Sequence, residues 1–211
     1  MENNGKRIIS LESWKRRENW LFFSGFANPM VSLTCPVEAG GAYRRAKAQG
    51  KSFFLVYLHA ILSAFNEIDE LHYRVDPQGQ IVRYDRIDAI APVRVPGRDG
   101  FTTLRFTYRP DAGEFIDAAR EVISNPGDAS AYSAENSLTE NDLILVSAVP
   151  CLAFTSADFT LRGSEGNPYP LILVGKLGDD GKMPIAISFH HGFVDGEHIG
   201  RFYSLVEHAM Q

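Results

Sequence analysis

Residues 184–198 read PIAISFHHGFVDGEH and hold three of the six histidines in this chain of 211 residues. The apolar run up to Phe189 predicts a β-strand whose side chains alternate inward and outward. Glycines on both sides of Asp195 break regular structure, so we expect His191 on a turn between strand and loop, with a helix after it. From such a turn an imidazole can project into a cleft.

Three interpretations of this turn compete. The plainest is a polar turn whose histidines cap the following helix. A metal site would need His190, His191, Asp195 and His198, but neighbouring strand residues point to opposite faces and cannot easily share one ion, so no metal is expected. The third is a general base, because a neutral imidazole can take a proton from a hydroxyl or thiol near pH 7.

Working outward, the patterning predicts a single α+β domain over residues 1–211. We expect helices at 42–51, 52–71, 112–124 and 197–210, a hairpin at 71–85, and strands at 87–95, 101–108, 143–148, 171–175 and 184–189. The strands and helices do not alternate regularly, which favours a large mixed β-sheet with flanking helices.

The overall charge and hydropathy exclude two classes of partner. A formal net charge of −5 indicates no general nucleic-acid surface. The basic clusters at 15–17 and 44–51 are most simply solvated helix faces, although a phosphate-bearing ligand could bind one of them. No run approaches about 18 apolar residues, so no membrane span is expected.

The two cysteines, Cys35 and Cys151, each lie within an apolar segment. This placement favours buried free thiols in a reducing compartment. The first residues, MENNGKRIIS, lack the apolar core of a secretory signal. We therefore expect a cytoplasmic protein.

The pattern HHxxxDG after an apolar strand resembles the signature of coenzyme-A-dependent acyltransferases. Further segments resemble those of chloramphenicol acetyltransferases, in the same order and at similar spacing: WKRRENWLFF (14–23), SLT (32–34), FNEIDELHYR (65–74), LVSAVP (145–150) and DGEHIGRF (195–202). The resemblance runs from about Trp14 to the C-terminus. A lipoyl-acyltransferase would normally carry linkers and a lipoyl module, and a condensation domain would be much longer, so neither fits.

This resemblance implies a fold, a reaction and roles for four residues. The fold would be that of the chloramphenicol acetyltransferases. His191 would be the general base for direct transfer of acetyl from acetyl-CoA, the co-substrate, to a hydroxyl acceptor. Ser147 would stabilise the oxyanion of the tetrahedral intermediate. Asp195 would pair with Arg16 and hold the catalytic loop without touching substrate.

The resemblance also implies where coenzyme A and neighbouring subunits bind. Lys176 matches a family lysine near the phosphate end of the nucleotide, whereas Lys51 lies one residue out of register with another such position. No acyl-enzyme on either cysteine is expected. The family is trimeric with active sites at subunit interfaces, which implies a homotrimer here.

The acceptor pocket departs from that of the drug-modifying members. By resemblance it comprises Phe23, Val31, Phe101, Ala157, Phe159 and Leu173. Phe23 stands where a tyrosine is usual and Leu173 where a threonine is common. Each lost hydrogen bond weakens binding on the order of 1 kcal/mol. Acetylation machinery is expected, but the identity of the acceptor does not follow.

Two functions remain open on the sequence alone. The favoured one is an O-acetyltransferase acting on chloramphenicol or a related hydroxyl compound. The alternative is a catalytically silent relative that binds coenzyme A or a hydrophobic small molecule as a sensor. Joint retention of the four residues with assigned roles favours the enzyme. Whether the protein confers antibiotic resistance is left open.

Overall fold

The structure is a computed structural model that describes residues 4–97, 99–127, 141–160 and 169–211. The strands of the large sheet are β2 (Met30–Glu38), β5 (Asp88–Val93), β6 (Thr102–Phe106), β7 (Leu143–Ala148), β8 (Leu171–Val174) and β9 (Lys182–His190). The helices are α1 (Arg17–Phe23), α2 (Gly40–Ala48), α3 (Phe53–Glu67), α4 (Ala112–Ser124) and α6 (Gly196–Met210), with a 3₁₀ turn η1 (Asp69–His72) after α3. A smaller sheet contains β1 (Arg7–Ile8), β3 (Tyr73–Val75) and β4 (Ile81–Arg83).

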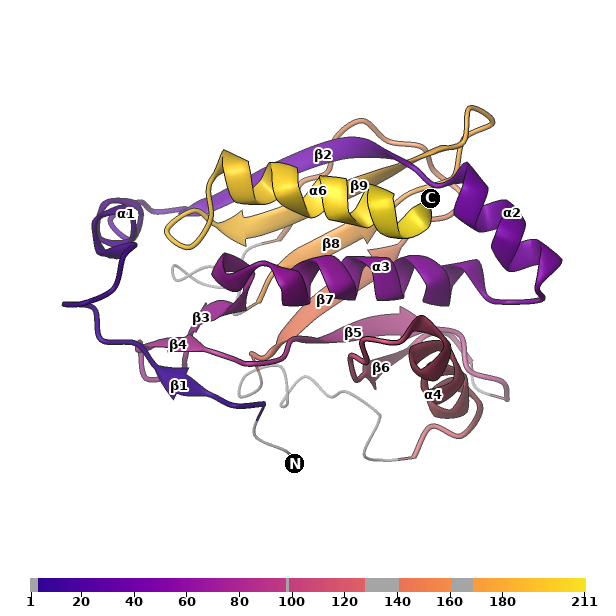
Figure 1. The fold of residues 1–211 in the computed structure, drawn as a ribbon, viewed down its shortest axis with the longest axis horizontal. Helices are drawn as coiled ribbons and strands as arrows, with labels where there is room; N and C mark the ends of the chain where they lie inside the picture. The colour runs from indigo at the N-terminus through magenta and orange to yellow at the C-terminus, as the bar shows by residue number, and fades with distance from the viewer. Residues whose placement is uncertain (1–3, 98, 128–140, 161–168) are drawn as a thin grey trace.

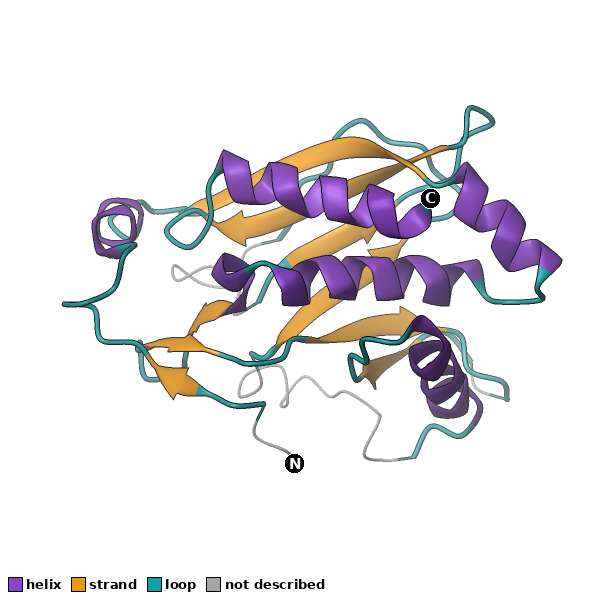
Figure 2. Cartoon of the chain, viewed as in Figure 1, coloured by secondary structure: helices purple, strands orange, loops and turns teal. Residues whose placement is uncertain are grey.

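The six strands form a mixed sheet in the order β2-β9-β8-β7-β5-β6. Helices α3 and α6 lie side by side across one face of this sheet (Figure 1). Figure 2 shows α3 and α6 in front of strands of the large sheet, with α1 and α2 to either side. The predicted α+β class with a large mixed sheet and flanking helices is confirmed.

Alternation along the strands divides their side chains between two faces. Ile144 and Val146 of β7 point toward the helices, where Phe65 of α3 and Phe202 of α6 meet with ring centroids 5.4 Å apart. We call this packing the helix-side core. The intervening residues of β7 point to the other face, where Leu143 joins a smaller apolar cluster.

Most predicted elements appear close to their expected bounds. Helix α4 begins and ends where predicted, and Asp111 caps it by accepting a hydrogen bond from the Glu114 N–H at 2.9 Å. The hairpin is confirmed, with Gly79 at φ +75° in its turn. The predicted helix at 52–71 is too long, because α3 ends at Glu67 and the chain tightens into η1.

Strand β2 was not predicted from the sequence, and the predicted burial of Cys151 is wrong. Strand β2 contains Pro36, a residue that sheets tolerate at an edge, and β2 is the edge strand beside β9. Cys151 is exposed rather than buried, because it follows the end of β7 in a turn that leaves the sheet; Cys35 is half-buried. Both thiols are free.

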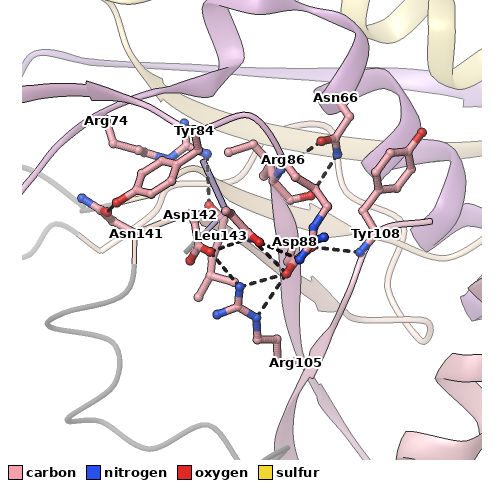
Figure 3. A network of polar contacts seen from close by, with 12 residues as sticks. Asn66, Arg74, Tyr84, Arg86, Asp88, Arg105, Tyr108, Asn141, Asp142 and Leu143 are labelled. Atoms are coloured by element: carbon pink, nitrogen blue, oxygen red, sulfur yellow. Dashed lines mark hydrogen bonds and ion pairs between the residues drawn. The ribbon is translucent and has the colours of Figure 1, made fainter. Parts of the chain in front are cut away.

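A buried polar network joins the starts of two parallel strands (Figure 3). Asp88 opens β5 and Asp142 directly precedes β7, and Arg105 from β6 bridges their carboxylates at 2.8 and 2.7 Å. Asn4 donates a hydrogen bond to Asp142 at 2.6 Å, which ties the N-terminal segment to the same cluster. Arg86 adds a second cation at 3.1 Å from Asp88.

Candidate active site

His191 is the first residue after β9, at the turn the sequence predicted. Its backbone N–H donates to the carbonyl of Pro29 at 2.8 Å, which fixes the start of the turn. Its ring Nδ1 lies 2.8 Å from the carbonyl oxygen of Val194. A carbonyl can only accept, so Nδ1 carries the proton and Nε2 keeps its lone pair. A neutral imidazole held in this way can act as a base.

An aromatic ring covers the imidazole. Phe23, the last residue of α1, stacks on His191 with ring centroids 3.9 Å apart and an interplanar angle of 11°. Helix α1 buries none of its residues, so this contact lies at the protein surface of the single chain. The predicted pocket residue Val31 lies nearby on β2, opposite Phe189, and packs against the helix-side core.

The neighbouring His190 has a different environment. It stacks on Trp20 at 4.7 Å, and its Nδ1 accepts the N–H of Gly192 at 3.1 Å. Burial lowers the pKa of His190 to about 4, so the ring is neutral near pH 7. A Cβ at Gly192 would lie 2.9 Å from Trp20, so glycine permits this close packing. The two histidines therefore have separate partners.

Asp195 and Arg16 form the predicted pair, and it lies behind the turn. Arg16 is buried, and its Nη1 donates to Oδ2 of Asp195 at 3.2 Å while Nε faces the carbonyl of Gly192 at 3.4 Å. Burial opposes ionisation of Asp195, but the hydrogen bond from Arg16 and the charge of His198 outweigh it. The pKa of Asp195 is therefore below its ordinary value.

Four other predicted residues lie toward the opposite end of the sheet: Ser147, Leu173, Lys176 and Phe101. Ser147 of β7 and Leu173 of β8 are half-buried register neighbours. Lys176 is exposed just beyond β8, and its N–H donates to Leu152 in the irregular segment that carries the half-buried Ala157 and Phe159. Phe101 is 65% exposed and precedes β6 at this same end, with the Arg94 guanidinium 4.9 Å from its ring centroid.

Ser147 and His191 do not meet within one chain. Ser147 pairs with Leu173, which pairs with Ala186, so one row of residues crosses β7, β8 and β9. His191 lies five residues beyond Ala186 along the chain. At about 3.3 Å per residue and about 4.8 Å between strands, the two Cα atoms are roughly 19 Å apart. We call the two groups the imidazole half-site (Arg16, Phe23, His191 and Asp195) and the serine half-site (Ser147, Leu173 and Lys176).

Two residues beside the imidazole half-site were not predicted from the sequence to belong to the site. Trp20 supports His190, and in the sequence it appeared only as part of the segment WKRRENWLFF (14–23). His198 was weighed only as a helix cap or metal ligand, yet its Nδ1 lies 2.7 Å from Oδ1 of Asp195. Among the described residues, no cluster of three or more His, Cys, Asp or Glu is arranged to hold a metal ion. Nor does any helix in those ranges combine the length and apolarity needed to cross a membrane.

Comparison with known proteins identifies the family. The family model for chloramphenicol acetyltransferase matches residues 5–207. A chloramphenicol acetyltransferase from Proteus mirabilis is 26% identical over 206 residues, covering 96% of this chain and 94% of that protein. A solved structure of a chloramphenicol acetyltransferase has a TM-score of 0.89 and 46% identity, covering 98% of this chain and 100% of that one.

A more distant structure shares the fold alone. The cubic core of the pyruvate dehydrogenase multienzyme complex has a TM-score of 0.62 at 15% identity, covering 98% of this chain and 89% of that one. The fold, with a histidine turn at the end of β9, defines the class of coenzyme-A-dependent acyltransferases. Within that class, the chain belongs to the chloramphenicol acetyltransferase family. It is an acyltransferase, and no finding supports the silent sensor.

Proposed function

We propose that this protein transfers an acetyl group from acetyl-CoA to a hydroxyl of chloramphenicol or a related small molecule, with His191 as general base. The contact that supports this role most directly is the one from Nδ1 to the Val194 carbonyl, which leaves Nε2 free to take a proton. The names of the relatives support chloramphenicol as the acceptor. The apolar substitutions at Phe23 and Leu173 leave room for a different hydroxyl compound.

The proposed reaction needs neither a metal ion nor an acyl-enzyme intermediate, and each proton and leaving group in it is accounted for. His191 Nε2 takes the hydroxyl proton as the acceptor oxygen attacks the thioester carbonyl. The tetrahedral intermediate carries an oxyanion, and the hydroxyl of Ser147 donates a hydrogen bond to it. The C–S bond then breaks, and the imidazolium returns its proton to the departing thiolate. Lys176, exposed at the serine half-site, is proposed to contact a phosphate of coenzyme A.

We further propose that the working unit is a homotrimer in which each active site joins two chains. The separation of roughly 19 Å between Ser147 and His191 supports this, because one chain cannot place both at a single carbonyl. Exposed apolar side chains beside the imidazole half-site give further support. Leu21, Phe22 and Phe26 are 45%, 63% and 51% exposed in the single chain. A surface of this kind is typical of a protein interface.

The proposed reaction is tested by thiol release from acetyl-CoA over a panel of hydroxyl acceptors. The panel includes chloramphenicol and the drug without its primary hydroxyl. His191→Ala should lower kcat about 10²- to 10⁴-fold, because general-base catalysis contributes that much. His208→Ala, at an exposed position in the last turn of α6, is the matched control and should retain activity.

Two outcomes would contradict the proposal. Turnover that is unchanged in the His191→Ala variant would remove the base from the mechanism. No turnover with any acceptor would favour the sensor. Separately, growth on chloramphenicol of cells that produce the protein would test whether resistance is conferred. The cytoplasmic location expected from the sequence stays a prediction.

A further inference from the structure

A ring of charged contacts closes behind the catalytic turn, and only part of it is the Arg16–Asp195 pair. His198, in the first turn of α6, contacts Asp195 through Nδ1 at 2.7 Å and faces Glu70 of η1 through Nε2 at 3.5 Å. Glu70 in turn binds Lys15 at 2.6 Å. Lys15 and Arg16 are adjacent in the sequence, so the contacts form a closed loop. We call it the charged ring: Lys15, Glu70, His198, Asp195 and Arg16.

The charged ring is mostly shielded from solvent, and the pKa values of its groups are shifted by their contacts with one another. The side chains of Glu70 and His198 are 13% and 17% exposed, whereas Lys15 is 62% exposed. Burial would raise the pKa of Glu70, but the hydrogen bond from Lys15, a backbone hydrogen bond and the charges of His198 and Lys15 together outweigh it, so the pKa lies below its ordinary value. The same hydrogen bond raises the pKa of Lys15. Near pH 7 both carboxylates of the ring are ionised.

One peptide group connects the ring to the imidazole of His191. The carbonyl of Val194 and the N–H of Asp195 belong to the same planar peptide unit. The carbonyl accepts the hydrogen bond from Nδ1 of His191 at 2.8 Å, and the N–H faces Nδ1 of His198 at 3.2 Å. A rotation of this plane would turn the carbonyl away from His191 and release its ring.

His198 can hold Asp195 in either of its protonation states, through the backbone N–H in one and through the carboxylate in the other. When neutral with the proton on Nε2, its Nδ1 accepts the N–H of Asp195. When protonated on both nitrogens, Nδ1 donates to Oδ1 of Asp195, which lies 2.7 Å away. In both states Nε2 carries a proton toward Glu70, so His198 keeps its contact with Glu70 and one hydrogen bond with Asp195.

We propose that His198 is a positioning residue for acetyl transfer, acting through the 194–195 peptide on the orientation of His191. It touches neither substrate nor the reacting atoms. This inference rests on the proposed role of His191 as the base. Its consequence is that loss of His198 lowers kcat, while the KM values for acetyl-CoA and acceptor stay close to those of the wild type.

Three substitutions separate the two contacts of His198. His198→Asn keeps a donor and an acceptor where Nδ1 stands, and so keeps the contact with the turn. His198→Gln carries its amide further out, where Nε2 faces Glu70. His198→Phe keeps the ring volume and makes neither contact. We expect His198→Phe and His198→Gln to lower kcat about 10- to 100-fold, as small misplacements of a catalytic group do, and His198→Asn to stay within a few-fold of wild type.

A second measurement tests the link to Glu70. Glu70→Gln should lower kcat by itself, and its effect should be smaller when combined with His198→Phe than in the wild type, because both act along one chain of contacts. Thermal unfolding of each variant confirms that kcat is measured on folded protein. If His198→Phe does not fold, comparing kcat of His198→Asn with kcat of His198→Gln still tests the positioning role.

The possible outcomes distinguish this inference from the proposed function. Equal kcat for the Asn and Gln variants, or wild-type kcat for all variants, would overturn the positioning role while His191→Ala still abolishes turnover. A change confined to KM would also overturn it. If His191→Ala itself keeps full activity, the proposed role of His191 as base is wrong, and the charged ring then has no base to position.

Discussion

At the scale of single residues, two adjacent histidines have been given different properties by their surroundings. His191 keeps one nitrogen on a carbonyl and offers the other outward, with Phe23 stacked on its face. His190 is buried against Trp20, with its pKa lowered to about 4. The burial of His190 makes the stability of the protein depend on pH.

Lowering the pH from 7.5 to 5 should destabilise the fold by roughly 2 kcal/mol through His190 alone. The unfolded chain takes up this proton near pH 6.5 and the folded protein only near pH 4. Stability is therefore full above pH 6.5 and falls as the pH drops toward 4. His72, whose pKa burial also lowers, adds a loss of the same sign.

Urea unfolding at fixed protein concentration measures this effect. His190→Phe, which keeps a ring on Trp20, is the control and should lose less stability between pH 7.5 and 5 than the wild type. An identical pH dependence in the two proteins would contradict the assignment. The ionised carboxylates Asp195 and Glu70 have lowered pKa values, so their contributions disappear only below about pH 4.

The residues of the imidazole turn could be predicted because they lie close together in the sequence. His191 and Asp195 share one segment, and the pairing of Asp195 with Arg16 came from the family pattern and appears in the structure. The contact between His198 and Glu70 could not be derived in that way. It depends on how η1 and α6 pack, and nothing in a local pattern specifies that distance.

At the scale of elements, local sequence signals predicted most helices and strands but not which strands pair with each other. Helix α4 could be predicted from its cap and periodicity, and β7 from its apolar run. Strand β2 was missed because it is half-exposed and contains proline, which weakens both signals. The parallel pairing of β5 with β7 joins residues far apart in the sequence, so the Asp88–Asp142–Arg105 network was not foreseen.

That network should be a large contributor to stability. Arg105→Met removes the cation that bridges two buried carboxylates and leaves their charges undercompensated, which should cost about 3–5 kcal/mol. Arg201→Met is the matched control, because its pair with Glu67 is more than half exposed and should contribute at most about 1 kcal/mol.

Chemical denaturation of the wild type and the two variants measures the difference. Similar losses for Arg105→Met and Arg201→Met would show that the buried network contributes no more than a surface ion pair. The histidine turn at the end of β9 lies outside this network, so any loss of activity in Arg105→Met should be explained by loss of folded protein.

At the scale of the whole molecule, the two half-sites at opposite ends of the sheet are the decisive feature. From the sequence alone, an interface site could be expected only by resemblance, because spacing along a chain does not reveal distance in space. The register of β7, β8 and β9 supplies that distance. It supports an assembly in which the serine of one copy meets the imidazole of another.

Mixing two inactive variants tests this assembly. His191→Ala and Ser147→Ala should each have little activity alone. When the two chains are produced together, an interface that combines the intact imidazole of one with the intact serine of the other should regain activity above either variant. Wild-type protein that sediments as a monomer, or mixtures no more active than the separate variants, would contradict a shared site.

The opposite placement of the half-sites has a consequence for how such a protein can evolve. Leu173 and Lys176 stand at strand ends remote from the histidine turn of their own chain. In the proposed assembly, substitutions there reshape what the enzyme accepts without entering the packing around His191. Part of the substrate range can thus change by substitution at the serine half-site while the contacts that hold His191 in its own chain are conserved; the rest depends on Phe23, which stacks on His191 itself.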